Sequence, residues 1–193
     1  MYSIVGFLSR PHGLNVLKTL IENSEYKILK IYTHSLNPKS QDPKRSERKE
    51  FKEIFELCKE NNIELAIINE KTEVITDIPK CDFIVEVSWR YLIPQIILKN
   101  ASILAFGIHR GKLPEYAGAE PIKQALEKNE KEIILSAHHL EDIIDAGSTI
   151  ETISFKIESD FEKNLEFRIQ KIRDEITPLF SKLALLTLKK FHK

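Results

Sequence analysis

Two stretches of the sequence carry residue types suited to acid–base chemistry. Residues 101–122 open with an apolar run and then present His109 ahead of a loop punctuated by glycine and proline, and residues 138–149 add His138, a second histidine and three acids that include Asp145. An imidazole at the carboxyl end of a strand, beside a carboxylate, moves protons near neutral pH. If the fold brings the two stretches together, we expect His109 and Asp145 to form the pair that transfers protons.

The same stretch also contains the ligand types of a zinc site. The candidate ligands are His138, His139, Glu141, Asp142 and Asp145. Adjacent histidines on a strand point to opposite faces, so they do not converge on one ion. We therefore expect no bound metal and keep a metal-dependent hydrolase only as a minor alternative.

The composition limits the class of protein. The chain has 193 residues, which suits one domain, and its 29 Lys+Arg balance its 29 Asp+Glu. A net charge of zero disfavours non-specific nucleic-acid binding. The first residues lack the basic start of a signal peptide, and no apolar run approaches the roughly 20 residues of a membrane span. We expect a soluble, cytoplasmic protein in which Cys58 and Cys81 are buried, reduced thiols.

Alternating strand and helix patterns indicate an α/β fold. Short apolar or alternating runs predict seven strands, at Tyr2–Phe7, Lys27–Tyr32, Leu65–Ile68, Asp82–Val87, Ala101–Phe106, Glu132–His139 and Ser148–Glu158. Apolar residues at helical spacing predict helices over 14–21, 51–58, 93–98, 119–128 and 165–176, and Thr177–Pro178 resembles the cap and first turn of a separate last helix. Short apolar strands that alternate with helices favour a mostly parallel sheet.

The first strand ends in a turn, LSRPHG, that leads into the first helix. The backbone amides of such a turn hold a phosphate in many α/β proteins, and Ser9, Arg10 and Gly13 are the candidates here. The glycine spacing fits neither a dinucleotide fingerprint nor a P-loop, so a plain loop with a helix cap is an equal alternative.

Two further segments follow predicted strands at the edge where open α/β sheets bind ligands. Trp89, Arg90 and Tyr91 come directly after the fourth strand and are candidate pocket residues, although packing on a neighbouring helix is the favoured interpretation for Trp89. Residues 33–45 form a long polar loop, a candidate for acceptor specificity. The charge run KRSERKE that overlaps its end is interpreted as the solvated start of a helix.

Four motifs together resemble a known family. They are SWRYLIPQIIL, FGIHRGKLPEYAGAEPI, HHLEDIIDAGSTI and KIRDEITPLFSKL, and they look like the formyltransferases that use 10-formyltetrahydrofolate, which include the glycinamide ribonucleotide, methionyl-tRNA and sugar-nucleotide enzymes. The family pattern is Asn-Ile-His, then Leu-Pro-x-Tyr-x-Gly-x-x-Pro, then a His and Asp-x-Gly. The matching positions are Ile108, His109, Leu113, Pro114, Tyr116, Gly118, Pro121, His138, Asp145 and Gly147.

The resemblance implies a mostly parallel seven-stranded Rossmann-like sheet with helices on both faces. It also implies that His109 stabilises the oxyanion and shuttles a proton, and that Asp145 sets the charge of the imidazole. The pterin of the folate would lie against Arg90–Leu92 and the backbone of the loop before Asp145. The cofactor-binding residues expected on this basis are Trp89, Arg90, Tyr91, Leu92, Leu140, Glu141, Asp142, Ile143 and Ile144.

One position departs from the family pattern, because Gly107 stands where the catalytic asparagine is expected. Losing one oxyanion donor typically costs about 10²–10³ in rate. Three explanations stay open. Another donor, a backbone N–H or a side chain such as His139, replaces the carboxamide; the reaction has changed; or the domain keeps a ligand pocket without turnover.

The expected function is formyl transfer from 10-formyltetrahydrofolate to the primary amine of a small molecule, with an amino-sugar nucleotide as the first candidate. Ser9, Arg10, Gly13 and Gly107 are the expected substrate-binding residues. The alternatives are a non-catalytic folate- or nucleotide-binding relative, or activity like that of the glycinamide ribonucleotide or methionyl-tRNA enzymes. We expect one catalytic domain over 1–193 that ends in helices without a tRNA-binding domain, no membrane or nucleic-acid partner, and a homodimer as the assembly to test.

Overall fold

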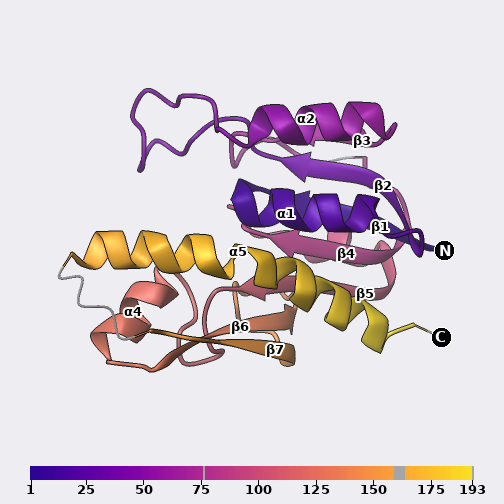
Figure 1. The fold of residues 1–193 in the computed structure, drawn as a ribbon. Coiled ribbons are helices and arrows are strands. Elements are labelled where there is room, and N and C mark those ends of the chain that lie inside the picture. Colours follow the sequence, from indigo (N-terminus) through magenta and orange to yellow (C-terminus); the bar gives the residue numbers. More distant parts are fainter. Residues whose placement is uncertain (76, 159–163, 193) are drawn as a thin grey trace. The chain divides into compact units, whose positions relative to one another are not determined.

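The computed structural model describes residues 1–75, 77–158 and 164–192 (Figure 1). The chain divides into two compact units, Met1–Ala105 and Phe106–Lys193. The expectation of a single domain over 1–193 stays a prediction.

The first unit is built from parallel strands and the helices between them. Its strands are β1 (Tyr2–Leu8), β2 (Tyr26–Thr33), β3 (Glu64–Ile67) and β4 (Cys81–Val87), and its helices are α1 (Arg10–Ile21), α2 (Phe51–Glu60) and α3 (Gln95–Leu98). β1 pairs in parallel with β2 and with β4, and β2 pairs in parallel with β3. α1 and α2 contact each other and run along these strands (Figure 1). Every strand in this unit therefore reaches the next through a crossover.

The second unit holds the carboxyl end of β5 (Ala101–His109), with β6 (Glu132–His139), β7 (Thr149–Lys156), α4 (Pro121–Glu127) and α5 (Leu165–Lys190). β5 pairs antiparallel with β6, and β6 pairs antiparallel with β7. α5 contacts β6, β7 and α4. The antiparallel hairpin of β6 and β7 lets the long loop after β6 return beside the end of β5.

The strands form one seven-stranded sheet in the order β3-β2-β1-β4-β5-β6-β7. The predicted α/β class and the mostly parallel seven-stranded sheet are confirmed, and every predicted strand corresponds to an observed one. The two predicted thiols, Cys58 and Cys81, are buried and free. Within the described residues, no helix combines the length and the apolar character needed to cross a bilayer.

The prediction of two helices after residue 164 is wrong, because α5 is continuous and Pro178 lies inside it. Pro178 cannot donate a backbone hydrogen bond to the carbonyl of Asp174, and the hydroxyl of the preceding Thr177 donates to the carbonyl of Arg173 at 2.8 Å. The apolar face runs unbroken past the proline, with Ile176 before it and Phe180 after it fully buried. Tertiary burial of this face holds the helix together across a residue that would otherwise end it.

Candidate active site

β5 delivers His109 to the end of the sheet. Phe106, Gly107 and Ile108 are buried, and the side chain of His109 is 10% exposed. In the register of β5 with β6, Gly107 lies opposite His138 and His109 lies opposite Ser136. The predicted catalytic histidine is thus fixed on a strand rather than on a mobile turn.

Asp145 lies between two imidazoles. Its Oδ2 is 3.2 Å from Nδ1 of His109, and its Oδ1 is 3.6 Å from Nε2 of His138. The amide N–H of Gly118 donates to Oδ2 at 2.9 Å. Asp145 has a positive φ of 57° and its side chain is 13% exposed. The predicted pair of His109 and Asp145 is therefore assembled within one unit, with His138 as an additional member.

The second ring nitrogen of His109 is also engaged. Its Nε2 lies 2.7 Å from the backbone carbonyl of Tyr116, so both nitrogens face acceptor oxygens. Burial lowers the pKa of His109, while Asp145 and the Tyr116 carbonyl act in the opposite direction. Burial also lowers the pKa of His138, whose Nδ1 is 3.0 Å from the carbonyl of His139. Both imidazoles can exchange protons with a carboxylate in a site largely closed to water.

Gly147 closes the loop that carries Asp145. A Cβ at this position would lie 1.9 Å from the carbonyl oxygen of His139, a separation that no side chain tolerates. The N–H of His139 donates to the carbonyl of Ser148 at 3.1 Å and brings the loop ends together. Gly118 instead has a positive φ of 85° and open space around it. Both glycines serve backbone geometry.

The remaining residues of the loop reach into solvent. Glu141, Asp142, Ile143 and Ile144 are exposed, and Leu140 is partly buried. Ile143 and Ile144 are 69% and 62% exposed and are adjacent in the sequence, directly before the candidate acid Asp145. Neighbouring exposed isoleucines offer an apolar surface that a flat ring system can cover.

In the first unit, Trp89 packs in an aromatic cluster. Its ring stacks on His34 with centroids 4.1 Å apart and meets Phe7 edge-on at 5.1 Å. Its backbone N–H donates to Glu86 at 2.7 Å. Trp89 thus packs on an aromatic residue of β1 and on His34 after β2, the packing on a neighbouring helix stays a prediction, and the residue is only partly buried.

The backbone beyond Trp89 is held by residues that the sequence did not indicate. His34 accepts from the N–H of Arg90 at 3.2 Å and donates to the carbonyl of Ile68. Burial lowers the pKa of His34 to about 3, so the ring is neutral. The hydroxyl of Tyr91 donates to the carbonyl of Asn69 at 2.7 Å, and Leu92 is 42% exposed. His34 lies in the loop 33–45 that the sequence marked as a whole, but no motif singled out this histidine within it.

The first turn contains a cluster of guanidinium groups. Arg48, which is 4% exposed, donates to the hydroxyl of Ser9 at 2.5 Å. Arg48 and Arg90 both donate to the carbonyl of Leu36, at 3.2 and 2.8 Å. Burial lowers the pKa of Arg48 to about 10, and the nearby positive charges of Arg10 and Arg90 add to this effect. Three like charges gather here around one turn.

One acid partly balances this charge, since Glu50 is 3.5 Å from Arg48. The interpretation of KRSERKE as a solvated helix start is wrong for Arg48, because α2 begins at Phe51 and the guanidinium is buried before it. Gly13 packs against β1, where a Cβ would lie 2.9 Å from the backbone of Leu8. The turn is therefore a tightly packed element close to the guanidinium groups of Arg48 and Arg90.

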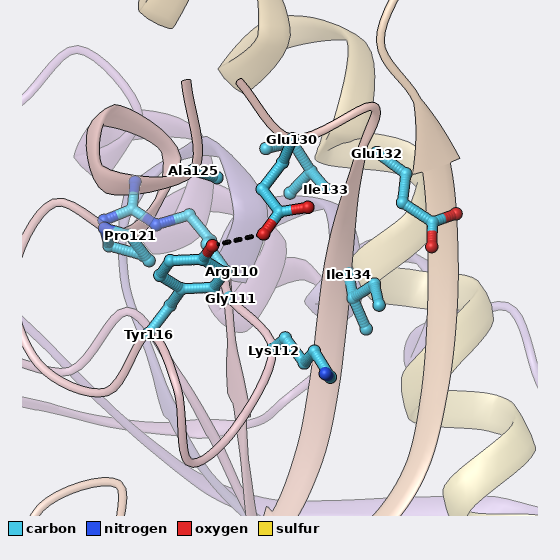
Figure 2. A pocket seen from close by; sticks show the side chains of 10 residues that line it. All are labelled: Arg110, Gly111, Lys112, Tyr116, Pro121, Ala125, Glu130, Glu132, Ile133 and Ile134. Atoms are coloured by element: carbon cyan, nitrogen blue, oxygen red, sulfur yellow. Dashed lines mark hydrogen bonds between the residues drawn. The ribbon is translucent and has the colours of Figure 1, made fainter. Parts of the chain in front are cut away.

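A separate pocket of about 290 Å³ lies outside the His109 site in the second unit (Figure 2). It is lined by Arg110, Gly111, Lys112, Tyr116, Pro121, Ala125, Glu130, Glu132, Ile133 and Ile134. The hydroxyl of Tyr116 donates to Glu130 in its wall (Figure 2). Among residues 1–75, 77–158 and 164–192, no three or more His, Cys, Asp or Glu side chains are grouped to hold a metal ion.

Both the sequence and the fold of this chain are similar to those of known proteins. The sequence pattern of the formyl transferase family matches residues 11–179. A methionyl-tRNA formyltransferase from Limosilactobacillus fermentum is 28% identical over 96% of this chain and 55% of its own length, so the chain spans about half of that relative. The crystal structure of phosphoribosylglycinamide formyltransferase from Bacillus halodurans superposes with a TM-score of 0.65 at 20% identity, over 95% of this chain and 94% of its own. WlaRD, a sugar 3N-formyl transferase crystallised in the presence of dTDP and 5-N-formyl-THF, superposes with a TM-score of 0.58 at 19% identity. The superposition covers 100% of this chain and 65% of WlaRD.

Proposed function

The chain belongs to the formyl transferase family, and from that premise we propose that it transfers a formyl group from 10-formyltetrahydrofolate to a primary amine. The observation that carries the proposal is the His109–Asp145 pair at 3.2 Å, largely closed to water at the end of β5. The pair supplies what such a reaction requires, a proton carrier beside a fixed negative charge.

In the proposed reaction the amine nitrogen attacks the formyl carbon and a new N–C bond forms. The carbonyl oxygen becomes an oxyanion, which the N–H at Nε2 of His109 stabilises while it also faces the Tyr116 carbonyl. The amine then loses a proton, the bond from the formyl carbon to the folate nitrogen breaks, and that nitrogen gains a proton. Asp145 keeps the imidazole oriented and stabilises its charged form while protons pass. One imidazole can serve both proton movements because the amine nitrogen and the folate nitrogen are bonded to the same carbon in the tetrahedral intermediate, and the proton that the first loses is passed to the second.

Gly107 favours a second candidate, a relative that binds folate or a nucleotide without turnover. A glycine has no carboxamide to donate to the oxyanion, and an enzyme lacking that donor is slower by about 10²–10³. His138, opposite Gly107 in the β5–β6 register, is a nearby group that can donate. In the leading proposal, His138 or a backbone N–H takes over the donation.

The guanidinium cluster of the first unit supports an acceptor that carries phosphate. A buried guanidinium is costly unless an anion approaches it, and Arg48 is 4% exposed with the carboxylate of Glu50 at 3.5 Å. A phosphate group would bring further negative charge to it. We assign Arg10, Arg90 and the buried Arg48 to this role, with Ser9 and Gly13 shaping the turn. An amino-sugar nucleotide has both the amine and the phosphates and is the first acceptor to test.

Two sets of residues are proposed for the folate carrier, each on its own evidence. In the second unit, the exposed Ile143 and Ile144 precede Asp145 and offer an apolar surface to the pterin. In the first unit, Arg90 to Leu92 follow β4, and His34 fixes the backbone of Arg90. We expect main-chain groups of these residues to bind the edge of the pterin ring.

The test is to incubate the purified protein with 10-formyltetrahydrofolate and a panel of amines. The panel contains amino-sugar nucleotides, glycinamide ribonucleotide and methionyl-tRNA, and the formylated product is detected by mass spectrometry. Product that disappears in His109→Asn and Asp145→Asn supports the transferase. No product with any amine, together with measurable folate binding and activity gained by Gly107→Asn, supports the non-catalytic alternative and ends the leading proposal.

A further inference from the structure

One turn of the second unit touches both members of the candidate catalytic pair. We propose that Tyr116, anchored by Glu130, is a positioning residue that holds His109 and Asp145 in register through main-chain groups of the Tyr116–Gly118 turn. This inference rests on the proposed function for its kinetic consequence. Its structural consequence can be tested independently.

The turn contacts the pair from two successive positions. The carbonyl oxygen of Tyr116 lies 2.7 Å from Nε2 of His109. Two residues later, the N–H of Gly118 donates to Oδ2 of Asp145 at 2.9 Å, the same oxygen that faces Nδ1 of His109. A displacement of this turn therefore moves a contact of the histidine and a contact of the acid together.

Local hydrogen bonds shape the turn, from the N–H of Tyr116 to the carbonyl of Lys112 at 2.8 Å and from the N–H of Ala117 to the carbonyl of Pro114 at 3.3 Å, but they do not tie it to the rest of the unit. In the stretch 112–120, only Leu113 and Tyr116 are buried, and residues 117–120 are all exposed. Tyr116 is 6% exposed, so its ring is the buried anchor nearest to the two catalytic contacts. Gly118 adopts a positive φ and has no neighbouring atoms within 4 Å of an added Cβ. The position of the turn thus depends on how the tyrosine ring is fixed.

Two groups outside the turn fix that ring. The hydroxyl of Tyr116 donates to Oε1 of Glu130 at 2.5 Å, and the ammonium of Lys128 lies 4.8 Å from the ring centroid. The hydrogen bond to Glu130 is the main cause that raises the pKa of Tyr116 to about 12. Figure 2 shows the hydroxyl of Tyr116 and the carboxylate of Glu130 meeting in the wall of the 290 Å³ pocket. Glu130 lies on the segment that leads into β6.

The charged groups around His109 determine what a titration reports. Asp145 and the Tyr116 carbonyl favour the protonated ring, whereas burial and Arg110 oppose it. His138 is the other titrating neighbour, since His109 is among the charges that lower its pKa. A loosened turn removes the carbonyl and shifts Asp145, so the titration of His109 changes even where substrate is absent.

The experiment compares Tyr116→Phe and Glu130→Ala with Glu130→Gln, whose amide oxygen still accepts from the hydroxyl. The matched control is Lys112→Met with Glu115→Gln, an exposed ion pair of 2.8 Å in the same loop. The imidazole resonances of His109, assigned with His109→Asn, are titrated by NMR, and kcat and KM for formyl transfer are measured in parallel. Tyr116→Phe keeps the packed ring, so it tests the hydroxyl contact without emptying the core.

We expect Tyr116→Phe and Glu130→Ala to displace the His109 titration and to lower kcat about 10-fold with little change in KM, because a displacement near 1 Å can cost up to about 10² in rate. We expect Glu130→Gln to keep most of the wild-type His109 titration and most of the wild-type kcat. An unchanged His109 titration in the two disruptive variants, in folded protein, overturns the inference. If the titration moves while the wild-type protein formylates no amine, the positioning role stands and the proposed function fails.

Discussion

At the scale of single residues, the candidate site combines side chains that the sequence predicts with main-chain contacts that it does not. His109 and Asp145 are brought together as predicted, at 3.2 Å. The carbonyl of Tyr116 and the N–H of Gly118 complete the arrangement. Main-chain groups are present at every position, so no residue type identifies which of them will bind a catalytic side chain. Only the folded loop selects them.

Gly147 provides a prediction at this scale. Gly147→Ala places a Cβ 1.9 Å from the carbonyl of His139, so the loop must shift and carry Asp145 with it. We expect the free energy of unfolding to fall by about 1–3 kcal/mol and formyl transfer to fall at least about 10-fold. Urea unfolding and the formylation assay measure the two effects. The exposed neighbour Ser148→Ala should change neither, and equal losses in both variants would show that the steric argument is wrong.

At the scale of elements, α5 depends on burial rather than on its local sequence. Pro178 is exposed inside the helix, and its ring replaces the N–H that would bind the carbonyl of Asp174. Pro178→Ala should raise the free energy of unfolding by about 1–2 kcal/mol, less than the full helix-propensity difference, because proline also restricts the unfolded chain. Glu175→Ala, an exposed substitution in the same helix, is the control and should stay within about 0.5 kcal/mol. Stability that is unchanged or lower in Pro178→Ala contradicts this account.

Periodicity predicts most of these elements because each strand and helix buries one regular face. The seven strands are found near their expected limits, and β6 spans Glu132–His139 as predicted. Sequence pattern gives the wrong result at Pro178, because a helix-breaking residue lies within a buried face that continues through Ile176 and Phe180. It also fails at Arg48, since a buried charge in a run of exposed charges has the same local pattern as its neighbours. In both cases a tertiary contact overrides the local signal.

At the scale of the whole molecule, buried histidines link stability to pH. His34, His109 and His138 all have pKa values that burial lowers, to about 3 for His34. His34 is neutral in the folded protein, and His109 and His138 take up a proton at a lower pH than the histidines of the unfolded chain, whose pKa is near 6.5. The unfolded state then binds more protons, so the free energy of unfolding decreases below about pH 6.5. These histidines contribute fully above that value, and the loss continues down to their folded pKa values.

The window from about pH 6.5 to 5 isolates this effect, because carboxylates with lowered pKa values, such as Asp42 and Asp82, are ionised in both states there. Each histidine that stays neutral adds a slope of up to about 1.4 kcal/mol per pH unit. Urea unfolding at several pH values measures the slope. His34→Gln should reduce it, since one proton-binding site is lost from the unfolded state only. His192→Gln, a partly buried histidine at the end of the chain, is the matched control. If the slope in this window is absent, or is the same in both variants, the buried neutral state of His34 is not what links stability to pH.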